Sequence, residues 1–399
     1  MYWTVHLHSS PRRINYAAVV VGSSIITFGG YYNAKADDEE ALTIFALDTV
    51  KLKWWKLDKV NDVNAPSQRC GFSTVAYDKK IYLWGGNNDF FVCGSVFCYD
   101  TETLKWSISK VQGYVPEPRS GHSACMIGQR MYIYGGRYER YFCPEMCMYD
   151  VVENTWYTIQ TENNPPPIQD FHTVTAVGDR MYIFGGRCGK IIKNRKDHEV
   201  YSSDVYYYDT TLNIWVRPIV HGHKPPGRRN HSAFFHNNFW YIYGGFDKNE
   251  KTYFDDLYRY NVVRSTWSKV TPIGTAPCAR KRQISLVVED RVFIYGGISP
   301  LPVTRLFPTR GPKICRRKGN RLKHHDDLHV LDLNPSLKDI CLVKFCESVN
   351  DEKMISSKDL CIPKTLRRDL YFHQPTDIFN VTITDSEYED EEEYEVFFQ

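Results

Sequence analysis

The sequence predicts an all-β protein, a six-bladed β-propeller, with a short α-helical segment and an acidic disordered tail at its C-terminal end. Three observations carry this prediction. Apolar runs of four to six residues alternate with turn residues, and runs of this length are typical of strands rather than helices. Six runs end in a glycine pair, and the pairs recur every 50 to 59 residues: Gly29-Gly30, Gly85-Gly86, Gly135-Gly136, Gly185-Gly186, Gly244-Gly245 and Gly296-Gly297. A tryptophan stands six residues after an aspartate or asparagine in five repeats: Asp48/Trp54, Asp100/Trp106, Asp150/Trp156, Asp209/Trp215 and Asn261/Trp267.

Each repeat is expected to form one sheet of four short strands. Such a sheet cannot bury both of its faces alone, so it must pack against neighbouring sheets of the same kind. The glycine pair and the tryptophan, at a period of about 50 residues, resemble the kelch repeat, whose architecture is the β-propeller. We assign residues 1–333 to the propeller. We expect each glycine pair to lie where a strand ends beneath a large tryptophan or tyrosine, and the turn after it to need a positive φ angle.

The sixth repeat lacks its tryptophan, because Lys338 stands at the expected distance after Asp332. The missing residue is found at the other end of the chain, where the segment that starts at Trp3 resembles the segments that start at Trp156 and Trp267. We therefore expect residues 2–7 to form the outer strand of blade six and to close the ring, which removes exposed sheet edges.

The loop that leads into the first strand of each blade, here called the leading loop, carries a second signature. An arginine stands sixteen residues before the glycine pair at Arg13, Arg69, Arg119, Arg228 and Arg280, with Gln169 in its place in blade four. Three residues later stand Tyr16, Phe72, His122, His172, His231 and Gln283. We interpret most of these side chains as architectural, pairing with backbone groups of neighbouring blades, and the histidines as structural rather than metal-binding.

Strands in a blade alternate in direction, so the leading loops and the loops between the second and third strands emerge on one face of the ring, here called the mouth. Polar and aromatic residues gather there, some of them beside the repeated arginines of blades five and six: Arg137, Arg187, Arg228, Arg229, Asn230, Arg280, Lys281, Arg282, Tyr31, Phe171 and Phe246. Convergent arginines suit a carboxylate, because the guanidinium fork matches it bidentately. A solvated basic face fits the same residues, and the sequence leaves both interpretations open.

Two long loops, 187–203 and 298–326, are expected to rim the mouth. Residues 305–325 of the second contain eight Lys or Arg and no acid, and fit a mobile solvated loop, a nuclear-import signal or a nucleic-acid patch. Residues 385–395 contain eight acids and no base.

The composition limits which classes of protein the chain can belong to. The chain shows neither a signal peptide nor an apolar run of membrane-spanning length. Its twelve cysteines form no C-x-x-C pair, so we expect reduced thiols and a cytoplasmic and nuclear location. Strand thiols are the preferred interpretation of Cys143 and Cys147, and a zinc site is the alternative. We expect no metal, no cofactor, no catalytic residue and no membrane partner.

The pattern changes after Asp332. Asn334-Pro335-Ser336 predicts a helix start with Pro at the first helical position, and the next apolar residues recur at helical spacing: Leu337, Ile340, Cys341 and Phe345, with Lys344 in the same row. A second apolar set follows at Leu360, Ile362, Leu366 and Leu370. Packing on the propeller and docking in a partner's groove both remain open for these stripes. We assign residues 334–370 to this region and 371–399 to an acidic disordered tail.

These stripes resemble the paired boxes of kelch-propeller substrate receptors of elongin B/C–cullin-2 ubiquitin ligases. Ser336-Leu337-x3-Cys341-x3-Phe345 is similar to the elongin box, although Phe345 stands where the family has an aliphatic residue. Ile362-Pro363-x2-Leu366-x3-Leu370 fits the cullin-2 box fully. The resemblance to this family extends over residues 1–370. It implies elongin B/C contacts at Leu337, Cys341 and Phe345, and cullin-2 contacts at Ile362, Pro363, Leu366 and Leu370.

The family resemblance also implies a ligand, the C-terminal degron of a substrate protein, chiefly a tail that ends in glycine with an arginine upstream. Arg228 and Arg229 match the family's carboxylate-binding arginines. The remaining candidates for degron binding are Asn230, Arg119, Arg187, Arg282, Phe171 and Asp255. Asp170, Asp247 and Asp255 are the acids that the repeat phase places at the rim, where one could pair with the arginine of the peptide.

Two alternatives were weighed. A copper-radical oxidase needs a Tyr, His and Cys cluster that the sequence does not show beyond the repeat-phase histidines. A nuclear, chromatin-associated kelch scaffold would use the basic loop, although we expect nucleic acid to be an improbable partner. The tail after residue 334 discriminates, because a scaffold has no use for both boxes.

Overall fold

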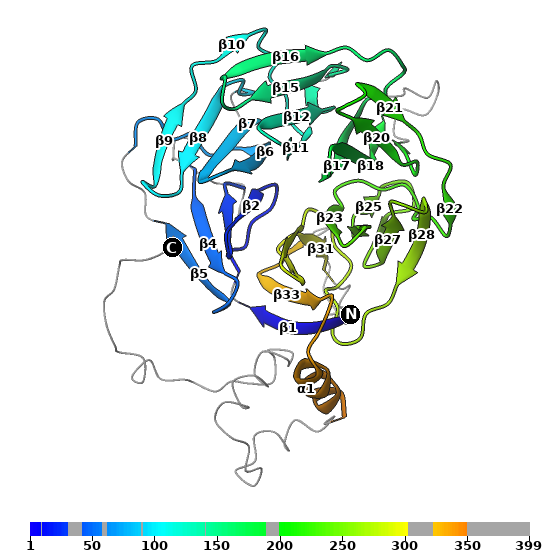
Figure 1. Cartoon of the computed structure of the whole chain (residues 1–399). Coiled ribbons are helices and arrows are strands. Elements are labelled where there is room, and N and C mark those ends of the chain that lie inside the picture. Colours follow the sequence, from blue (N-terminus) through cyan, green and yellow to red (C-terminus); the bar gives the residue numbers. More distant parts are fainter. Residues whose placement is uncertain are drawn as a thin grey trace, which may run out of the picture.

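Six four-stranded antiparallel sheets surround a central axis, as the computed structural model shows, so the predicted six-bladed β-propeller is confirmed (Figure 1). The structure describes residues 1–8, 10–30, 42–57, 62–88, 91–139, 141–188, 199–301 and 322–348. Tyr31, most of the basic 305–325 loop, the predicted cullin-2 box and the acidic tail lie outside the described residues.

The first three blades follow one another along the chain. Blade one consists of β2 (Ala17–Val21), β3 (Ser24–Phe28), β4 (Ile44–Asp48) and β5 (Lys53–Leu57). Blade two consists of β6 (Cys70–Tyr77), β7 (Lys80–Asn87), β8 (Val96–Asp100) and β9 (Lys105–Ile108). Blade three consists of β11 (Ser123–Ile127), β12 (Arg130–Tyr134), β15 (Met146–Asp150) and β16 (Thr155–Ile159), with β10 (Gln112–Gly113) parallel to β16.

The last three blades repeat this plan. Blade four consists of β17 (Gln169–Val177), β18 (Arg180–Cys188), β20 (Tyr206–Asp209) and β21 (Ile214–Val216), with β19 (Val200–Tyr201) paired to β18. Blade five consists of β23 (Ser232–His236), β24 (Phe239–Tyr243), β27 (Leu257–Asn261) and β28 (Thr266–Val270), with β22 (His221–Gly222) parallel to β28. Blade six consists of β29 (Ile284–Val288), β30 (Arg291–Tyr295), β33 (Asp327–Asp332) and β1 (Tyr2–His8).

Short hairpins extend the inner strands of three blades at the mouth. They are β13 (Arg137–Tyr138) with β14 (Tyr141–Phe142), β25 (Phe246–Asp247) with β26 (Thr252–Tyr253), and β31 (Ile298–Pro300) with β32 (Leu322–His324).

The two ends of the propeller meet in blade six. β1 pairs antiparallel with β33, so that Trp3 lies opposite Leu331 and Leu7 opposite Leu328 (Figure 1). Trp3 and Leu7 are buried. This is the place where the sequence predicts the closing strand.

One aromatic contact joins every blade to the preceding one. The tryptophan of each repeat packs on the aromatic residue that stands immediately before the glycine pair of the preceding blade, with ring centroids 5.1–6.1 Å apart. The pairs are Trp106–Phe28, Trp156–Trp84, Trp215–Tyr134, Trp267–Phe184, Trp3–Tyr243 and Trp54–Tyr295. Trp3 therefore fills in blade six the place that its own repeat leaves empty, and the six contacts complete a circle.

The glycine pairs have a positive φ, as predicted, but the neighbour that excludes a side chain is not the tryptophan. A Cβ on Gly185 would lie 2.5 Å from the His231 ring and 2.5 Å from the Arg228 carbonyl oxygen, both in the next blade. A Cβ on Gly186 would lie 2.7 Å from the Cβ of His172 in its own blade. The first glycine thus makes room for the next blade's leading loop and the second for its own.

The leading-loop arginines of blades two, three, five and six are buried structural side chains, whereas Arg13 in blade one is partly exposed. Arg228 donates to the Gly244 carbonyl oxygen (3.0 Å) and pairs with Asp256, and Arg280 likewise binds Gly296 (3.1 Å) and Asp327. Their own carbonyl oxygens accept hydrogen bonds from the second glycine of the preceding blade, at 2.8 Å for Gly186 and 2.9 Å for Gly245. The predicted pairing between blades is therefore made by the arginine's backbone, while its side chain binds within its own blade.

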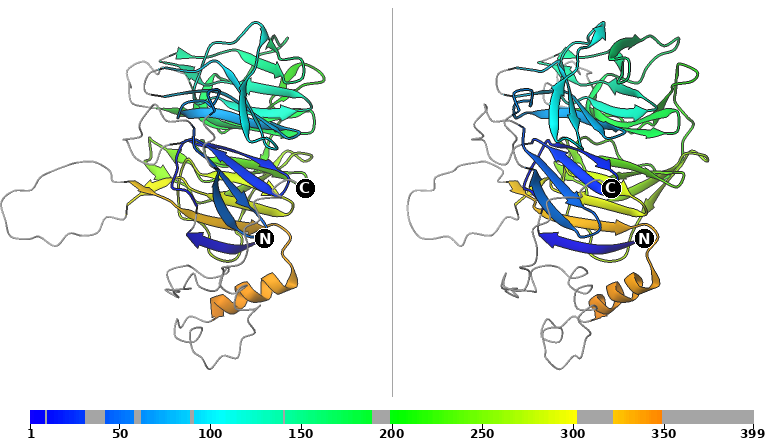
Figure 2. Two further views of the ribbon diagram at one scale, coloured as in Figure 1. Left: turned by 90° about the vertical axis from the view of Figure 1, so that its left-hand side faces the viewer. Right: turned by 60° about the vertical axis from the view of Figure 1, so that its left-hand side comes forward.

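The helix α1 (Leu337–Ser348) follows blade six and lies against β1, outside the ring (Figure 2). Its N-cap is Ser336, whose hydroxyl accepts from the Asp339 backbone N–H (3.2 Å) while the Asp339 carboxylate accepts from the Ser336 backbone N–H (3.2 Å). The predicted first helical residue, Pro335, is therefore two residues too early, because the reciprocal cap is at Ser336 and the helix begins at Leu337. Among the described residues, no helix has the length and apolar character needed to cross a membrane.

We expect deletion of residues 1–8 to unfold or strongly destabilise the propeller. The deletion exposes the edge of β33 and removes the buried side chains of Trp3, Val5 and Leu7, and loss of a buried Trp alone costs about 3–5 kcal/mol. Thermal unfolding followed by circular dichroism measures the effect. An unchanged midpoint would show that ring closure by β1 contributes nothing to stability.

Candidate functional site

Six equivalent residues, one per blade, line the axis of the ring at the mouth. They stand two residues after the leading-loop arginine or glutamine, all have φ between 54° and 69°, and we call them the collar: Asn15, Gly71, Gly121, Phe171, Asn230 and Arg282. Backbone hydrogen bonds of 2.9–3.0 Å link them head to tail from Gly71 to Arg282. They surround an axial cavity of about 150 Å³.

Two members of the collar are strained. Glycine and asparagine adopt positive φ readily, but phenylalanine and arginine do so at a cost of roughly 1–2 kcal/mol. Phe171 has φ 56° and Arg282 has φ 64°. Backbone strain of this kind persists where surrounding structure enforces it and gathers at binding sites. The strain here places an aromatic ring and a guanidinium beside the axial cavity.

Two predicted site residues, Arg228 and Arg119, are wrongly assigned to the ligand. Both side chains are fully buried. The Arg228 guanidinium lies 3.8 Å from the Phe254 ring centroid and forms an ion pair with Asp256. Arg119 donates to the carbonyl oxygens of Glu117 and Glu145 at 3.1 Å. A ligand at the mouth cannot reach either group, because these contacts enclose both guanidiniums inside their blades.

Arg229, the next residue, does face the mouth. Its guanidinium carbon lies 5.9 Å from the Phe171 ring centroid and 5.7 Å from that of Phe246, and its Nε lies 3.0 Å from the Glu199 carboxylate. This Nε is buried without a hydrogen-bond acceptor of good geometry among the described residues, so the contact with Glu199 is an ion pair rather than a hydrogen bond. The mouth thus has an aromatic cradle for one arginine.

Arg187 is neutralised by a buried acid. It binds the Asp170 carboxylate through two nitrogens, with Nε at 3.0 Å, and Arg137 lies 3.8 Å from the same carboxylate. Asp170 is fully buried, so the expectation that it stands at the rim is wrong. Asp255 is exposed, whereas Asp247 accepts backbone N–H bonds from its own turn at Asn249 (2.8 Å) and Glu250 (3.3 Å).

Arg282 and Lys281 provide positive charge without an acidic partner. No carboxylate lies within 4.0 Å of either among the residues that the structure describes. Burial, together with the charge of Arg229, lowers the pKa of Arg282, whose Nε is buried without an acceptor. The Nζ of Lys281 lies 4.0 Å from the Phe246 ring centroid and 5.0 Å from that of Tyr253. The Asn230 Nδ2 is likewise buried without an acceptor in the described part of the chain.

The site therefore contains three neighbouring cations, Arg229, Lys281 and Arg282, a carboxamide donor and one carboxylate, Glu199. An anion at the axial cavity would balance the charge and accept from several donors. The sequence predicted Arg229, Asn230, Arg282 and Phe171 at this place. It missed Glu199, because nothing in the repeat phase marks the far end of a long loop.

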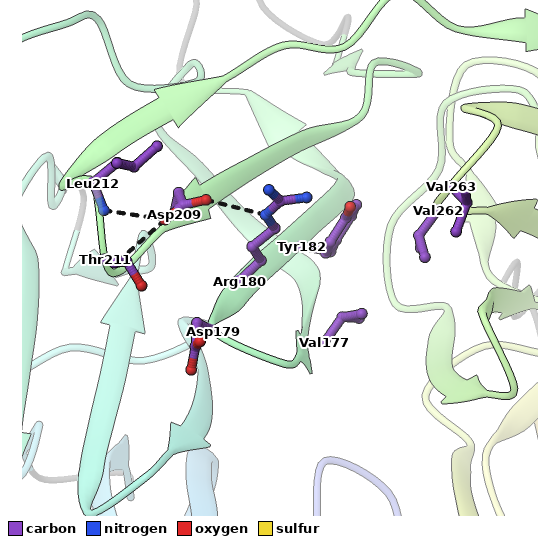
Figure 3. A pocket seen from close by; sticks show the side chains of 9 residues that line it. All are labelled: Val177, Asp179, Arg180, Tyr182, Asp209, Thr211, Leu212, Val262 and Val263. Atoms are coloured by element: carbon purple, nitrogen blue, oxygen red, sulfur yellow. Dashed lines mark hydrogen bonds and ion pairs between the residues drawn. The ribbon is translucent and has the colours of Figure 1, made fainter.

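A larger pocket, of about 650 Å³, lies on the face opposite the mouth, at the turns of blades four and five (Figure 3). Figure 3 shows Arg180 beside Asp209, and its Nε donates to that carboxylate at 3.1 Å. The lining also contains the aliphatic residues Val177, Leu212, Val262 and Val263, together with Asp179, Tyr182 and Thr211. Because Arg180 and Asp209 neutralise each other, this pocket offers no counterpart to the cations of the mouth.

One group of three potential metal ligands lies in the described part of the chain: His6, Asp327 and His329. Asp327 already binds Arg280 with both oxygens, and the His6 and His329 rings stack with centroids 4.1 Å apart. These contacts account for the cluster without an ion. Cys143 and Cys147 are buried strand-region thiols, as expected, and their burial raises the pKa of both.

Comparison with known proteins places this geometry in a family. Residues 3–107 and 71–297 match the family model of the KLHDC2/KLHL20/DRC7 kelch-repeats domain. The chain is 37% identical over 384 residues to kelch domain-containing protein 3 of Bos taurus, which covers 92% of this chain and 94% of that protein, and the figures are the same for Homo sapiens. Kelch domain-containing protein 2 of Bos taurus is 27% identical over 100 residues, 25% of this chain and 24% of that protein.

We expect Lys281 to react with acylating reagents at unusually low pH. Burial, together with the charges of Arg282 and Arg229, lowers its pKa to about 8, so a large share of the amine is neutral and nucleophilic near pH 8. Labelling with acetic anhydride over pH 6–11, read by peptide mass spectrometry, measures its titration midpoint. The same experiment on Lys281→Arg identifies the signal, and a midpoint above 10 would contradict the crowding of cations described above.

Proposed function

The chain belongs to the kelch-repeat propeller family of kelch domain-containing protein 3, and from this membership we propose that it is a substrate-recognition subunit of a cullin-2–elongin B/C ubiquitin ligase. Kelch propellers of this family are protein-binding scaffolds, and the proposed role is non-catalytic. The mouth binds the C-terminal carboxylate of substrate tails that end in glycine, and the bound protein is then ubiquitinated and degraded. We propose that this takes place in the cytoplasm and nucleus.

The observation that carries the proposal is the half-buried guanidinium of Arg282, whose Nε is buried and which lies at the axial cavity with no carboxylate partner among the described residues. A terminal carboxylate supplies the missing acceptor and the missing charge. Two charge-assisted hydrogen bonds of this kind contribute about 1.5–3 kcal/mol each. Arg229, Lys281 and the Asn230 amide complete the donor set.

The shape of the cavity supports a terminal glycine. It holds about 150 Å³, and two collar residues that line it, Gly71 and Gly121, have no side chain themselves. A ligand residue without a side chain can bring its carboxylate down to Arg282, whereas a bulky one meets the Phe171 ring. We assign the arginine upstream in the peptide to Asp255, because Asp170 is buried.

The helix α1 supports the partner half of the proposal. Leu342 and Val343 are buried and anchor the helix, whereas Leu337 is 77% exposed, Cys341 is exposed and Phe345 is 37% exposed. The residues at i, i+4 and i+8 thus form an apolar stripe that the propeller leaves accessible. We propose that elongin C covers it, and that cullin-2 binds the second box at Ile362, Pro363, Leu366 and Leu370.

We expect a peptide with a free C-terminal glycine to bind at least about tenfold more tightly than the same peptide with an amidated end, because amidation removes the charge that pairs with Arg282. Arg282→Ala should weaken the free-acid peptide to a similar degree. Fluorescence anisotropy measures both. Arg180→Ala, on the opposite face, is the matched control and should bind normally. Equal affinity for acid and amide would mean that the mouth does not read a C-terminus.

We expect Leu337→Ser to abolish co-purification of elongin B/C, since it puts a polar group at the exposed start of the stripe while the propeller stays folded. Affinity purification from cells followed by immunoblotting provides the readout, with Lys338→Ser as the control on the same turn. Elongin recovered at the wild-type level would remove the ligase assignment and favour a nuclear scaffold.

A further inference from the structure

Glu199 is the acid with the largest number of cationic neighbours in the described part of the mouth. Its carboxylate lies 3.0 Å from Arg229, 3.6 Å from Arg187 and 3.7 Å from Lys248, and it accepts a hydrogen bond from the Tyr201 hydroxyl. Its side chain is only 10% exposed. The Glu199 carboxylate thus makes the same kind of contact with cations that a ligand carboxylate would make at this site.

The backbone of Glu199 is fixed in this place by the neighbouring blade. The Asn249 side chain accepts from the Glu199 N–H (3.1 Å) and donates to the Glu199 carbonyl oxygen (2.6 Å). The Tyr201 hydroxyl also accepts from the Lys248 backbone N–H at 3.1 Å. The end of the long loop of blade four is therefore tied across to the β25–β26 hairpin of blade five, with the carboxylate held at the side of Arg229.

We infer that Glu199 is an internal competitor for the carboxylate site: its negative charge lies beside Arg229 and weakens the binding of every anionic ligand at the mouth. This inference rests on the proposed function, since it concerns the same site. It gives the site a low intrinsic affinity that only ligands with further contacts overcome.

The position of Glu199 distinguishes it from the architectural acids. Asp256 and Asp327 pair with arginines that are enclosed inside their blades and that no ligand can reach. Glu199 instead pairs with Arg229, whose neighbours in the mouth, Lys281 and Arg282, have no carboxylate within 4.0 Å among the residues that the structure describes. A ligand carboxylate that accepts from Arg229 lies within a few ångströms of the Glu199 charge, and two like charges at that distance in a partly buried site repel each other strongly.

The variant Glu199→Gln tests this directly, because it removes the charge and nearly keeps the shape, with one oxygen left to accept a hydrogen bond and an NH2 donor in place of the other. We expect the free-acid glycine peptide to bind Glu199→Gln at least about fivefold more tightly than wild type, the order expected for removal of one nearby like charge. The amidated peptide carries no charge at its end and should bind both proteins equally. That contrast separates repulsion from a mere loosening of the mouth, which would change both affinities alike.

Glu250→Gln is the matched control, since Glu250 lies in the turn of the same hairpin, is exposed and contacts none of the mouth arginines. It should leave both affinities unchanged. Thermal melts confirm that the variants are folded, and Glu199→Ala provides a second variant should the glutamine side chain be poorly accommodated.

The outcomes separate the two proposals. If wild type prefers the free acid but Glu199→Gln binds it no better, the competitor role is overturned and the carboxylate site stands. If wild type does not distinguish acid from amide but Glu199→Gln does, the wild-type degron function fails and the competitor role is supported. If neither protein distinguishes the two peptides, both proposals are overturned.

Discussion

The propeller depends on one contact that is repeated at every junction between blades. A tryptophan packs on the aromatic residue before the preceding glycine pair, and at five of the six junctions in the described part of the chain the second glycine also donates its N–H to a backbone carbonyl oxygen of the next leading loop. The aromatic contact buries a large apolar area, and the glycine hydrogen bond fixes the register of one blade against the next. Because Trp3 provides the aromatic contact in blade six, all six junctions have this contact.

The sequence was sufficient for the fold because periodicity is a local signal that repeats. Six glycine pairs and six tryptophans, one displaced to the N-terminus, determined the number of blades and the closing strand. The prediction gave the wrong reason for the first glycine of each pair, since its space borders the next blade's leading loop, chiefly the side chain three residues after that loop's arginine or glutamine. That neighbour belongs to another repeat, and a sequence does not display contacts between repeats.

The site could be predicted only in part, for the same reason. Arg228 and Arg229 are adjacent, and charge alone does not tell them apart. Their repeat phase does: the first position is a buried arginine in blades three, five and six, whereas the second and third positions vary from blade to blade. Residues that follow the repeat make the ring, and residues that depart from it at the mouth, such as Arg229, Lys281 and Arg282, are available for a ligand. Glu199 does not stand at a repeated position, so its place at the mouth could be found only from the structure.

Ring closure by β1 also has a consequence in time. β1 leaves the ribosome before every other strand, but its partner β33 ends at residue 332, so at synthesis rates of about 5–20 residues per second the closing strand waits roughly 15–65 s. During that interval, blades one to five can fold. β1 and the first strands of blade six still lack β33 between them, so their unpaired edges stay exposed to chaperones. The α1 residues emerge next, and the helix packs on β1 only when that strand is in place. In a nascent chain with an open ring, α1 therefore has no paired β1 to pack on, so the docking of this helix is coupled to the closure of the ring.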